Sequence, residues 1–272
     1  MSEETAASTA SEEAPEESGP RPESRGRTLV IALGLCLVCS VAVSGVAIAL
    51  HDRQVANQEN DRKKVILQVA GLYEEGASIE KLFAQVQSKV VELKTGQYVE
   101  DPAFDQRKAA KDPAQSVAIA SEHDVAKIRR RAKQASVYLV EKDGQTGLII
   151  LPVHGYGLWS TMYGFVALEP DANTISRVQF YEHAETAGLG SRITDPGWVG
   201  QFAGKRVYDE KGKTRVRVIK GQVPAGSAGA PYEIDGISGA TLTADGVTNL
   251  LQYWFGAHGF EPYLAKLKKS GA

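Results

Sequence analysis

The sequence predicts an α+β protein in which a single N-terminal transmembrane helix precedes a soluble mixed domain with an antiparallel sheet and helices. Three observations lead to this fold class. Residues 29–50 form an uncharged apolar run, and residues 135–181 contain strand-like runs joined by short turns. Near the C-terminus, apolar residues recur at the spacing of an amphipathic helix: Val247, Leu250, Leu251, Trp254 and Phe255. Strands that follow one another through short turns, with helices grouped at the ends, are typical of α+β domains.

The apolar run is long enough to cross a bilayer. Residues 29–50 are 22 residues without a charge, and a helix of about 20 such residues spans the hydrocarbon core. A cleaved signal peptide is the alternative, but its apolar region is about 7 to 15 residues long and begins nearer the N-terminus. We therefore expect an uncut anchor in contact with membrane lipid. Positive charges flank both ends, so counting them does not orient the helix.

The segments around the anchor are mostly polar. Residues 1–28 contain few large apolar side chains, which predicts a disordered tail. Residues 51–134 are expected to be a helical membrane-proximal region, and residues 267–272 a C-terminal tail. One helix in that region would be capped by Ser78 and would bury an apolar stripe of Ile79, Leu82, Phe83, Val86 and Val90. The run Arg129–Arg131 is interpreted as a solvated surface.

Residues 135–266 are predicted to be the folded core domain. ASVYLVE and TGLIILPV flank Asp143-Gly144, which is a strong hairpin signal. Further strands are expected over 160–168, 174–181 and 214–220, and the glycine-rich stretch 221–230 is expected to be a flexible loop.

Charge and cysteine usage exclude several function classes. The formal net charge is −2, and the part of the chain beyond residue 50 carries +2. A balance this close to neutral gives no strong attraction for a polyanion, so we expect no nucleic-acid partner. Both cysteines, Cys36 and Cys39, lie in the apolar run, where they are interpreted as small apolar side chains. The chain has no cysteine set for an iron–sulfur cluster and no dinucleotide-binding glycine motif after a strand.

Small residues and hydroxyls precede the amphipathic helix. Ser238, Gly239, Ala240 and Thr241 lie just before that helix, and the free N–H groups of a helix N-terminus stabilise a phosphate. Glycine and alanine let the backbone approach such a group closely. The alternative is that Ser238, Thr241 or Thr243 only caps the helix.

A second candidate segment runs from His183 to Gly190. His183 and Glu185 would share one face of a strand and suggest a metal pair, but two ligands are too few, and a solvated strand end is the favoured alternative. Thr186 and the turn Gly188–Gly190 suit a backbone that closes on a planar ligand.

These segments resemble the covalent flavin-binding domain family. Asp235, Ser238, Gly239 and Ala240 match its Asp-x-x-Ser/Thr-Gly-Ala-Ser/Thr motif, and the resemblance implies a phosphoester between FMN and the final residue, Thr241. Residues 183–190 resemble the family's His-x-Glu-Thr-Pro-Gly-Leu-Gly loop, which lines the flavin pocket, with Ala187 in the place of proline.

A third segment narrows the resemblance. Residues 155–165 are similar to the Gly-x-Gly-Leu-Trp-Ser-Thr-Met-Tyr-Gly run of the C-subunit family of Na+-translocating NADH:quinone oxidoreductases. Leu158, Trp159 and Leu189 would supply apolar faces for the flavin ring, although Trp159 could also be a core aromatic. The candidate FMN-binding residues are Leu158, Trp159, Ser160, Thr161, His183, Glu185, Thr186, Gly188, Leu189, Gly190, Lys220, Asp235, Ser238, Gly239, Ala240 and Thr241. No catalytic or metal-binding residue is expected.

The resemblance implies an electron-carrier subunit that holds FMN covalently. It further implies a complex of six subunits that transfers electrons from NADH to ubiquinone and exports Na+ across a bacterial inner membrane. The tail would be cytoplasmic, the domain periplasmic, and a flavin transferase would be needed for maturation. Three alternatives stay open: the related G subunit of the Rnf electron-transport complex, a membrane-tethered flavin-binding regulator, and a flavin-free interaction module with Thr241 as a helix cap.

Overall fold

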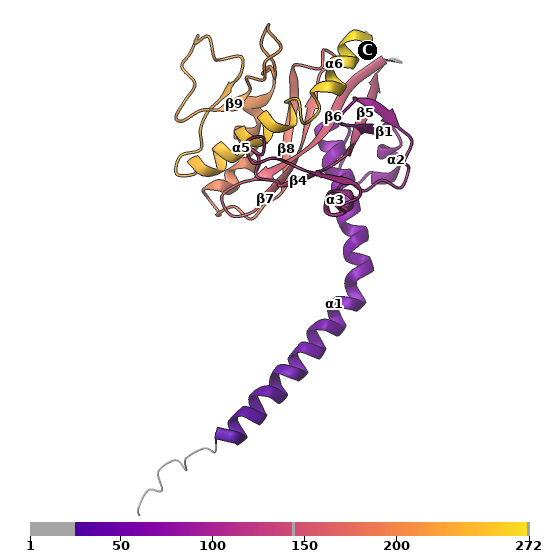
Figure 1. Ribbon diagram of the computed structural model, residues 1–272, viewed down its shortest axis with the longest axis vertical. Coiled ribbons are helices and arrows are strands. Elements are labelled where there is room, and N and C mark those ends of the chain that lie inside the picture. Colours follow the sequence, from indigo (N-terminus) through magenta and orange to yellow (C-terminus); the bar gives the residue numbers. More distant parts are fainter. Residues whose placement is uncertain (1–24, 143–144, 271–272) are drawn as a thin grey trace, which may run out of the picture. The chain divides into compact units, whose positions relative to one another are not determined.

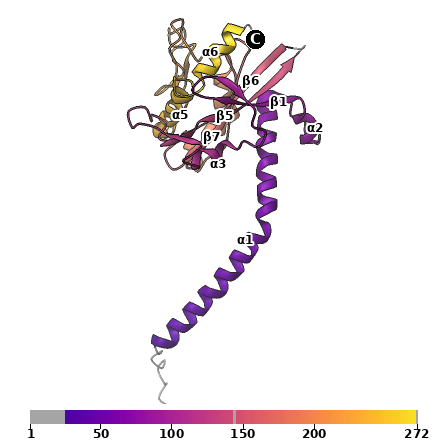
Figure 2. The same cartoon turned by 45° about the vertical axis from the view of Figure 1, so that its right-hand side comes forward.

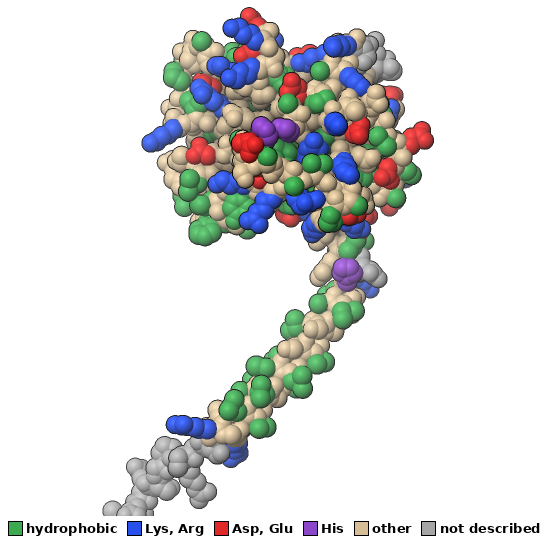
Figure 3. All heavy atoms as spheres, viewed as in Figure 1, with side chains coloured by type: hydrophobic (Ala, Val, Ile, Leu, Met, Phe, Trp, Pro, Cys, Tyr) green, Lys and Arg blue, Asp and Glu red, His purple; other side chains and the backbone are tan. Residues whose placement is uncertain are grey.

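The computed structural model describes residues 25–142 and 145–270, and the chain divides into two compact units, residues 1–56 and 57–272. Within the described residues, one helical segment, Arg25–His51, is long and apolar enough to cross a membrane. It belongs to helix α1 (Arg25–Ala70), and its side chains, Cys36 and Cys39 included, are exposed. Figure 3 shows hydrophobic side chains along this segment and basic ones at its N-terminal end. Of the tail expected over residues 1–28, residues 1–24 lie outside the described residues, as does the Asp143-Gly144 turn, whereas residues 25–28 belong to α1.

The second unit is built on a six-stranded antiparallel sheet (Figure 1). Its spatial order is β2 (Gln97–Val99), β1 (Val86–Glu92), β5 (Gln134–Lys142), β6 (Gln145–Tyr156), β7 (Thr161–Leu168) and β8 (Ile175–Glu182). The four strands β5 to β8 are consecutive in sequence and pair with their neighbours as a meander. The α+β prediction and the antiparallel pairing of the two runs beside residues 143–144 are confirmed.

Both faces of the central strands β5 to β7 are largely buried, which explains why these strands are apolar at most positions. Successive side chains of a strand point to opposite faces. Leu139 and Ile149 accordingly belong to one core cluster, whereas Tyr138 and Ile150 belong to a second one. The second cluster also contains the last turns of α1, including Ile66 and Leu67.

Helices from the C-terminal part of the chain belong to the first cluster. Helix α5 (Thr241–Trp254) contributes Trp254 and helix α6 (Glu261–Ser270) contributes Tyr263, and Figures 1 and 2 show both helices on one side of the sheet. α5 lies very close to β6, because a Cβ built on Gly155 would be 2.6 Å from Leu250 Cβ. The indole nitrogen of Trp254 donates a hydrogen bond to the carbonyl of His154, 2.6 Å away.

The region 51–134 differs from the predicted helical region. It contains α2 (Ile79–Phe83), β1, β2, α3 (Gln106–Lys111), β3 (Ser116–Ala118) and β4 (Arg130–Ala132), and β3 pairs antiparallel with β4. The helix expected from Ser78 to Val90 ends at Phe83, and Ser78 makes no side-chain capping bond. A spacing of four residues fits a helix and a strand equally well. Val86 and Val90 are therefore both buried in β1, where pairing with β5 along the whole strand replaces the helix.

The predicted strand over 214–220 is also shorter than expected. Only β9 (Arg217–Val218) forms, and it pairs in parallel with β10 (Glu233–Ile234). Residues 221–230, predicted as a loop, connect these two short strands without a helix or strand. Between β8 and β9 lie η1 (Gly190–Thr194), α4 (Pro196–Val199) and η2 (Gly200–Phe202).

The close approach of α5 to β6 predicts the effect of adding one methyl group. Gly155→Ala should lower the free energy of unfolding by about 1–3 kcal/mol, because the new Cβ would overlap Leu250 and force the helix away from the sheet. Gly197→Ala is the control, since nothing lies within 4 Å of its Cβ position. Urea unfolding of residues 57–272 measures both. Equal stability of the two variants would contradict the close packing.

Candidate functional site

The carboxylate of Glu185 connects the three segments that the sequence singled out. Glu185 is buried just after β8. Its Oε1 accepts hydrogen bonds from the backbone N–H groups of Leu158 and Trp159, both at 3.1 Å. Its Oε2 accepts a hydrogen bond of 2.5 Å from the hydroxyl of Thr243, in the first turn of α5. One side chain therefore holds the β6–β7 loop, its own loop and the start of α5 together.

Three glycines make room for this arrangement. A Cβ on Gly157 would lie 2.5 Å from a Glu185 carboxylate oxygen, and one on Gly190 would lie 2.6 Å from the Thr243 hydroxyl. A Cβ on Gly246, one turn further along α5, would lie 2.7 Å from the carbonyl oxygen of Tyr156. Real Cβ atoms do not approach other atoms this closely, so the three segments can meet only because these positions have no side chain.

The hydrogen bonds keep Glu185 ionised although it is buried. Burial by itself raises the pKa of a carboxyl group. Here the hydrogen bonds from the Thr243 hydroxyl and from the backbone of residues 158–160 outweigh burial and lower the pKa of Glu185 below its usual value. The site therefore contains a fixed negative charge that accepts hydrogen bonds from the backbone of the β6–β7 loop and from the Thr243 hydroxyl.

Thr241 is exposed at the open N-terminus of α5. It is the first residue of this 14-residue helix, the N-cap residue is Ala240, and no side chain makes a capping bond there. The alternative that Ser238, Thr241 or Thr243 caps the helix is therefore wrong. The preceding Gly239 has φ +76°, a left-handed conformation that favours glycine. The free N–H groups and the partial positive charge of this helix end suit a phosphate group.

Large apolar side chains are exposed around this helix end. The exposed fraction is 63% for Trp159, 60% for Leu242, 43% for Leu189 and 38% for Leu158. Leu189 Cδ2 is 3.0 Å from the position that a Cβ on Gly239 would occupy, so the 183–190 loop lies against the motif before Thr241. The alternative that Trp159 is a core aromatic is wrong, because most of its ring faces solvent.

Further hydrogen bonds join the two loops beside Glu185. The indole N–H of Trp159 donates to the hydroxyl of Thr186 over 3.0 Å, and the Ser160 hydroxyl accepts from the backbone N–H of Ala184 over 2.7 Å. His183 Nδ1 accepts from the backbone N–H of Glu185 at 3.2 Å. His183 Nδ1 thus bonds within its own loop, whereas the Glu185 carboxylate bonds the neighbouring loop and α5. The favoured expectation of a solvated strand end is wrong for Glu185, which is buried.

The remaining candidate residues lie at the edges of the site. Thr161 begins β7 opposite Tyr156, and Gly188 has φ +74° and donates its N–H to the Ser191 hydroxyl. The Asp235 carboxylate accepts from the backbone N–H of Val223 at 2.8 Å, so it holds the glycine-rich loop. Lys220 is exposed, and the residue after it, Gly221, accepts a hydrogen bond from the N–H of Gly236.

Sequence reasoning missed the roles of Thr243 and Gly157. The sequence suggests Thr243 only as a helix cap, yet this residue is buried and bonds Glu185. Gly157 stands out only as part of a motif, yet its missing side chain is what admits the carboxylate. The signal for Gly157 is the Gly-x-Gly spelling before Leu158, but its partner Glu185 lies in a different segment of the chain.

Replacing Glu185 by glutamine should destabilise the domain in a pH-dependent way. Glu185→Gln removes the charge that accepts these bonds and should cost about 1–3 kcal/mol near neutral pH. The folded-state pKa is lowered, so the stabilisation by the ionised group is complete above the unfolded-state pKa of about 4.3 and is lost as the pH falls through the folded-state pKa.

Urea unfolding of the wild type and the variant between neutral and strongly acidic pH measures this difference. The difference in free energy of unfolding between the two proteins should disappear as the pH is lowered. Glu210→Gln, at an exposed position, is the control and should not change stability. If this difference stayed constant across the whole pH range, the stabilisation by Glu185 would come from the shape of its side chain and not from its charge.

A protein-family model matches the part of the chain that contains the site. The family model described as an FMN-binding domain matches residues 157–256. These residues include the β6–β7 loop, the 183–190 loop and all of α5, and hence every group that contacts the Glu185 carboxylate.

Solved structures of related proteins share the fold. The crystal structure of NqrC from Shewanella oneidensis aligns with a TM-score of 0.73 and 38% identity, covering 79% of this chain and 99% of that one. The crystal structure of the C subunit of the Na(+)-translocating NADH-quinone reductase from Parabacteroides distasonis aligns with a TM-score of 0.61 and 28% identity, covering 79% and 96%.

Curated relatives match over nearly their whole length. The C subunit of the Na(+)-translocating NADH-quinone reductase of Vibrio vulnificus is 47% identical over 248 residues, which is 90% of this chain and 96% of the relative. The same protein of Pseudomonas aeruginosa is 48% identical over 257 residues, covering 92% and 98%. The chain therefore belongs to the NqrC family, the C subunits of Na(+)-translocating NADH-quinone reductases.

Proposed function

We propose that this chain carries FMN covalently, through a phosphoester on Thr241, and relays electrons between redox subunits of a membrane-bound Na+-translocating NADH:ubiquinone reductase. The observation that carries the proposal is the position of Thr241. Its hydroxyl-bearing side chain is exposed at a helix N-terminus without a side-chain cap. The apolar side chains exposed around it are typical of a binding site.

The residues at the site fit FMN. The N–H groups at the start of α5 would bind the phosphate, and Gly239 lets the backbone approach it. Leu158, Trp159 and Leu189 would contact the apolar ring system. When bound, FMN supplies the reversible electron chemistry, while the protein sets its position and electronic environment.

The role of the other residues is to position this surface. Glu185 holds the loop that carries Leu158 and Trp159 at a defined place relative to α5, so the ring contacts and the attachment point cannot move independently. Lys220 lies on the segment hydrogen-bonded to Gly236, where its charge would favour the phosphate. No residue of this chain is assigned a catalytic step, because the attachment point need not change during turnover.

The family supports the wider context of the proposal. Relatives with 47–48% identity are named as the C subunit of the Na(+)-translocating NADH-quinone reductase, which favours this assignment over an Rnf-type G subunit. We propose that the chain works in a complex of six subunits in the bacterial inner membrane that transfers electrons from NADH to ubiquinone and exports Na+. Loading of Thr241 would depend on a flavin transferase. Copurification with quinone reductase activity tests the assembly.

Thr241→Ala should abolish covalent FMN and leave stability almost unchanged, because the side chain is exposed and makes no cap. Thr241→Ser keeps the hydroxyl and should retain partial loading. Each protein is exported to the periplasm of a host with the flavin transferase, denatured, and examined by in-gel flavin fluorescence and intact mass. The wild type should gain the mass of FMN less one water. Covalent FMN on the alanine variant would show that the attachment site is wrong.

A periplasmic domain predicts the outcome of thiol labelling in intact cells. Lys211→Cys places a thiol at an exposed position of the second unit. A membrane-impermeant maleimide should label this variant and not the wild type, because Cys36 and Cys39 lie in the apolar segment. Labelling that requires cell lysis would reverse the proposed orientation.

A further inference from the structure

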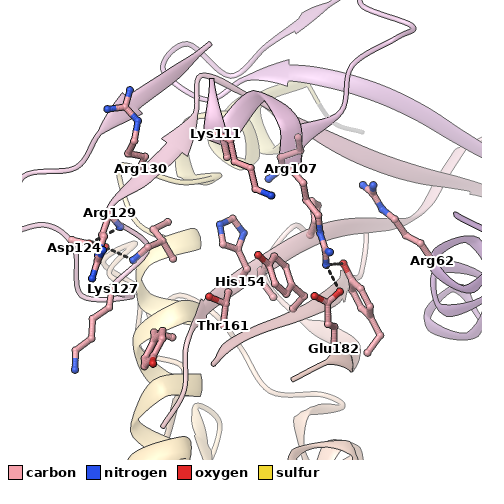
Figure 4. Close-up of a pocket in the computed structure, with 18 of the residues that line it drawn as sticks. Arg62, Arg107, Lys111, Asp124, Lys127, Arg129, Arg130, His154, Thr161 and Glu182 are labelled. Atoms are coloured by element: carbon pink, nitrogen blue, oxygen red, sulfur yellow. Dashed lines mark hydrogen bonds and ion pairs between the residues drawn. The ribbon is translucent and has the colours of Figure 1, made fainter. Parts of the chain in front are cut away.

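A large cleft lies on the second face of the sheet, next to the last turns of α1 (Figure 4). Its volume is about 1300 Å³. Pro152, His154 and Tyr163 form its floor, and by strand alternation they share a face with Ile150 in the second core cluster. α3 and the segment 121–130 form its walls. The cleft is therefore the part of this sheet face that α1 leaves uncovered.

Positive side chains dominate the lining. The cations are Arg62, Arg107, Lys111, Lys127, Arg129 and Arg130, whereas Asp124 and Glu182 are the acidic residues. Among the described residues, Arg107 is the one cation of this set with an ion-pair partner, Glu182 at 2.7 Å. Asp124 accepts hydrogen bonds from the backbone of Ile128 and Arg129 and so stabilises its own turn. The run Arg129–Arg131, expected to be an ordinary solvated surface, contributes two of these cations.

The floor of the cleft is aromatic and uncharged. The guanidinium carbon of Arg107 lies 3.8 Å from the centre of the Tyr163 ring, and His154 stacks on the same tyrosine with ring centres 5.4 Å apart. Burial and the nearby charge of Arg107 lower the pKa of His154 to about 4, so this imidazole is neutral at physiological pH. Lys111 and Arg107 come from α3 and extend toward the same space (Figure 4).

Arg62 leaves part of its donor capacity unused. Its Nη2 donates to the hydroxyl of Tyr138 at 3.0 Å, whereas its Nε is buried and has no hydrogen-bond partner among the described residues. An unsatisfied buried donor is costly and is usually explained by a missing partner. Arg62 therefore places a positive charge at the α1 end of the cleft, and its Nε is buried beneath that surface without a hydrogen-bond partner among the described residues.

The cleft adjoins the proposed flavin site. Tyr156 and Thr161 line it and also bracket the loop whose backbone bonds Glu185. The Tyr156 hydroxyl donates to the carbonyl of Trp159, over 3.2 Å. The exposed Trp159 thus lies in the short loop whose two ends line the cleft.

We propose that this cleft docks an acidic segment of a neighbouring protein subunit that exchanges electrons with the flavin; the proposal rests on the function proposed above. Arginine and aromatic residues at the centre, with exposed charges at the rim, are the composition of a protein interface. The cations come from several elements around a volume larger than the roughly 300–1000 Å³ of small-molecule pockets. They can therefore pair with several carboxylates at once, and docking there would bring the partner to Tyr156 and Thr161, at the two ends of the loop that carries Leu158 and Trp159.

Zero-length cross-linking of the assembled complex tests the contact directly. A carbodiimide joins a lysine amine to a carboxylate as an amide, with loss of water, only where the two groups touch. Peptide mass spectrometry should find Lys111 and Lys127 joined to Asp or Glu of a second subunit. Lys211 and Lys213, which are exposed and outside the cleft, serve as the controls. Absence of intermolecular cross-links at both cleft lysines would overturn the proposal.

Reversing the charge of three exposed cations of the cleft, here called the rim, tests whether docking at the cleft supports electron transfer. The triple variant Lys111→Glu, Lys127→Glu and Arg129→Glu should lower NADH-driven quinone reduction by the complex at least about tenfold at low ionic strength. The matched control is Lys211→Glu, Lys213→Glu and Arg215→Glu, which changes the charge by the same amount outside the cleft. Equal turnover of the two triple variants would overturn the proposal.

Two further readouts distinguish the ways in which the proposals can fail. In-gel flavin fluorescence reports the proposed function independently: cross-links in a complex without covalent flavin would support docking and refute the flavin assignment. Binding to phosphatidylglycerol vesicles, compared with phosphatidylcholine vesicles, reports a lipid headgroup. Loss of that binding in the rim variant, together with unchanged turnover, would assign the cleft to an anionic lipid and overturn the protein partner.

Discussion

The buried, ionised carboxylate of Glu185 is the interaction on which the site depends. A carboxylate removed from water must have its acceptor positions filled, and here the β6–β7 loop and the first turn of α5 fill them. The carboxylate and the loops around it depend on each other. The loops need the charge to meet at one point, and the charge needs glycine at positions 157 and 190 to fit between them. Thr241 is thereby placed beside the exposed apolar side chains.

The proposed flavin site and the basic cleft lie on opposite faces of the sheet. One face is covered by α5 and α6, and the N-terminal end of α5 carries the proposed attachment point. The other face is partly covered by the end of α1, and the uncovered remainder forms the basic cleft. The short β6–β7 loop links them, because Tyr156 and Thr161 at its ends line the cleft and Leu158 and Trp159 within it belong to the proposed flavin site. A carrier that must hold a cofactor and also meet a partner benefits from having these surfaces adjacent but separately built.

Local patterns predicted much of the fold, and the failures have a common cause. The meander strands and α5 were found because their apolar patterns extend over many residues. The helix expected over 78–90 was wrong because Val86 and Val90 satisfy two periods, and only pairing with β5 decides between them. The strand expected over 214–220 is limited to Arg217–Val218, the residues that pair with Glu233–Ile234, and a pattern within 214–220 does not reveal how far a partner elsewhere in the chain extends.

By itself, the sequence determined the anchor-like helix, the fold class and the motif that contains Thr241, since each depends on residues close together in the chain. Tertiary structure alone decided that Glu185 is buried and ionised, that Trp159 faces solvent and Thr243 does not, and that cations from several separate segments share one cleft. The physical reason is distance along the chain. Thr243 and Glu185 are 58 residues apart in sequence, and no periodicity within either segment reveals that the folded sheet brings them into contact.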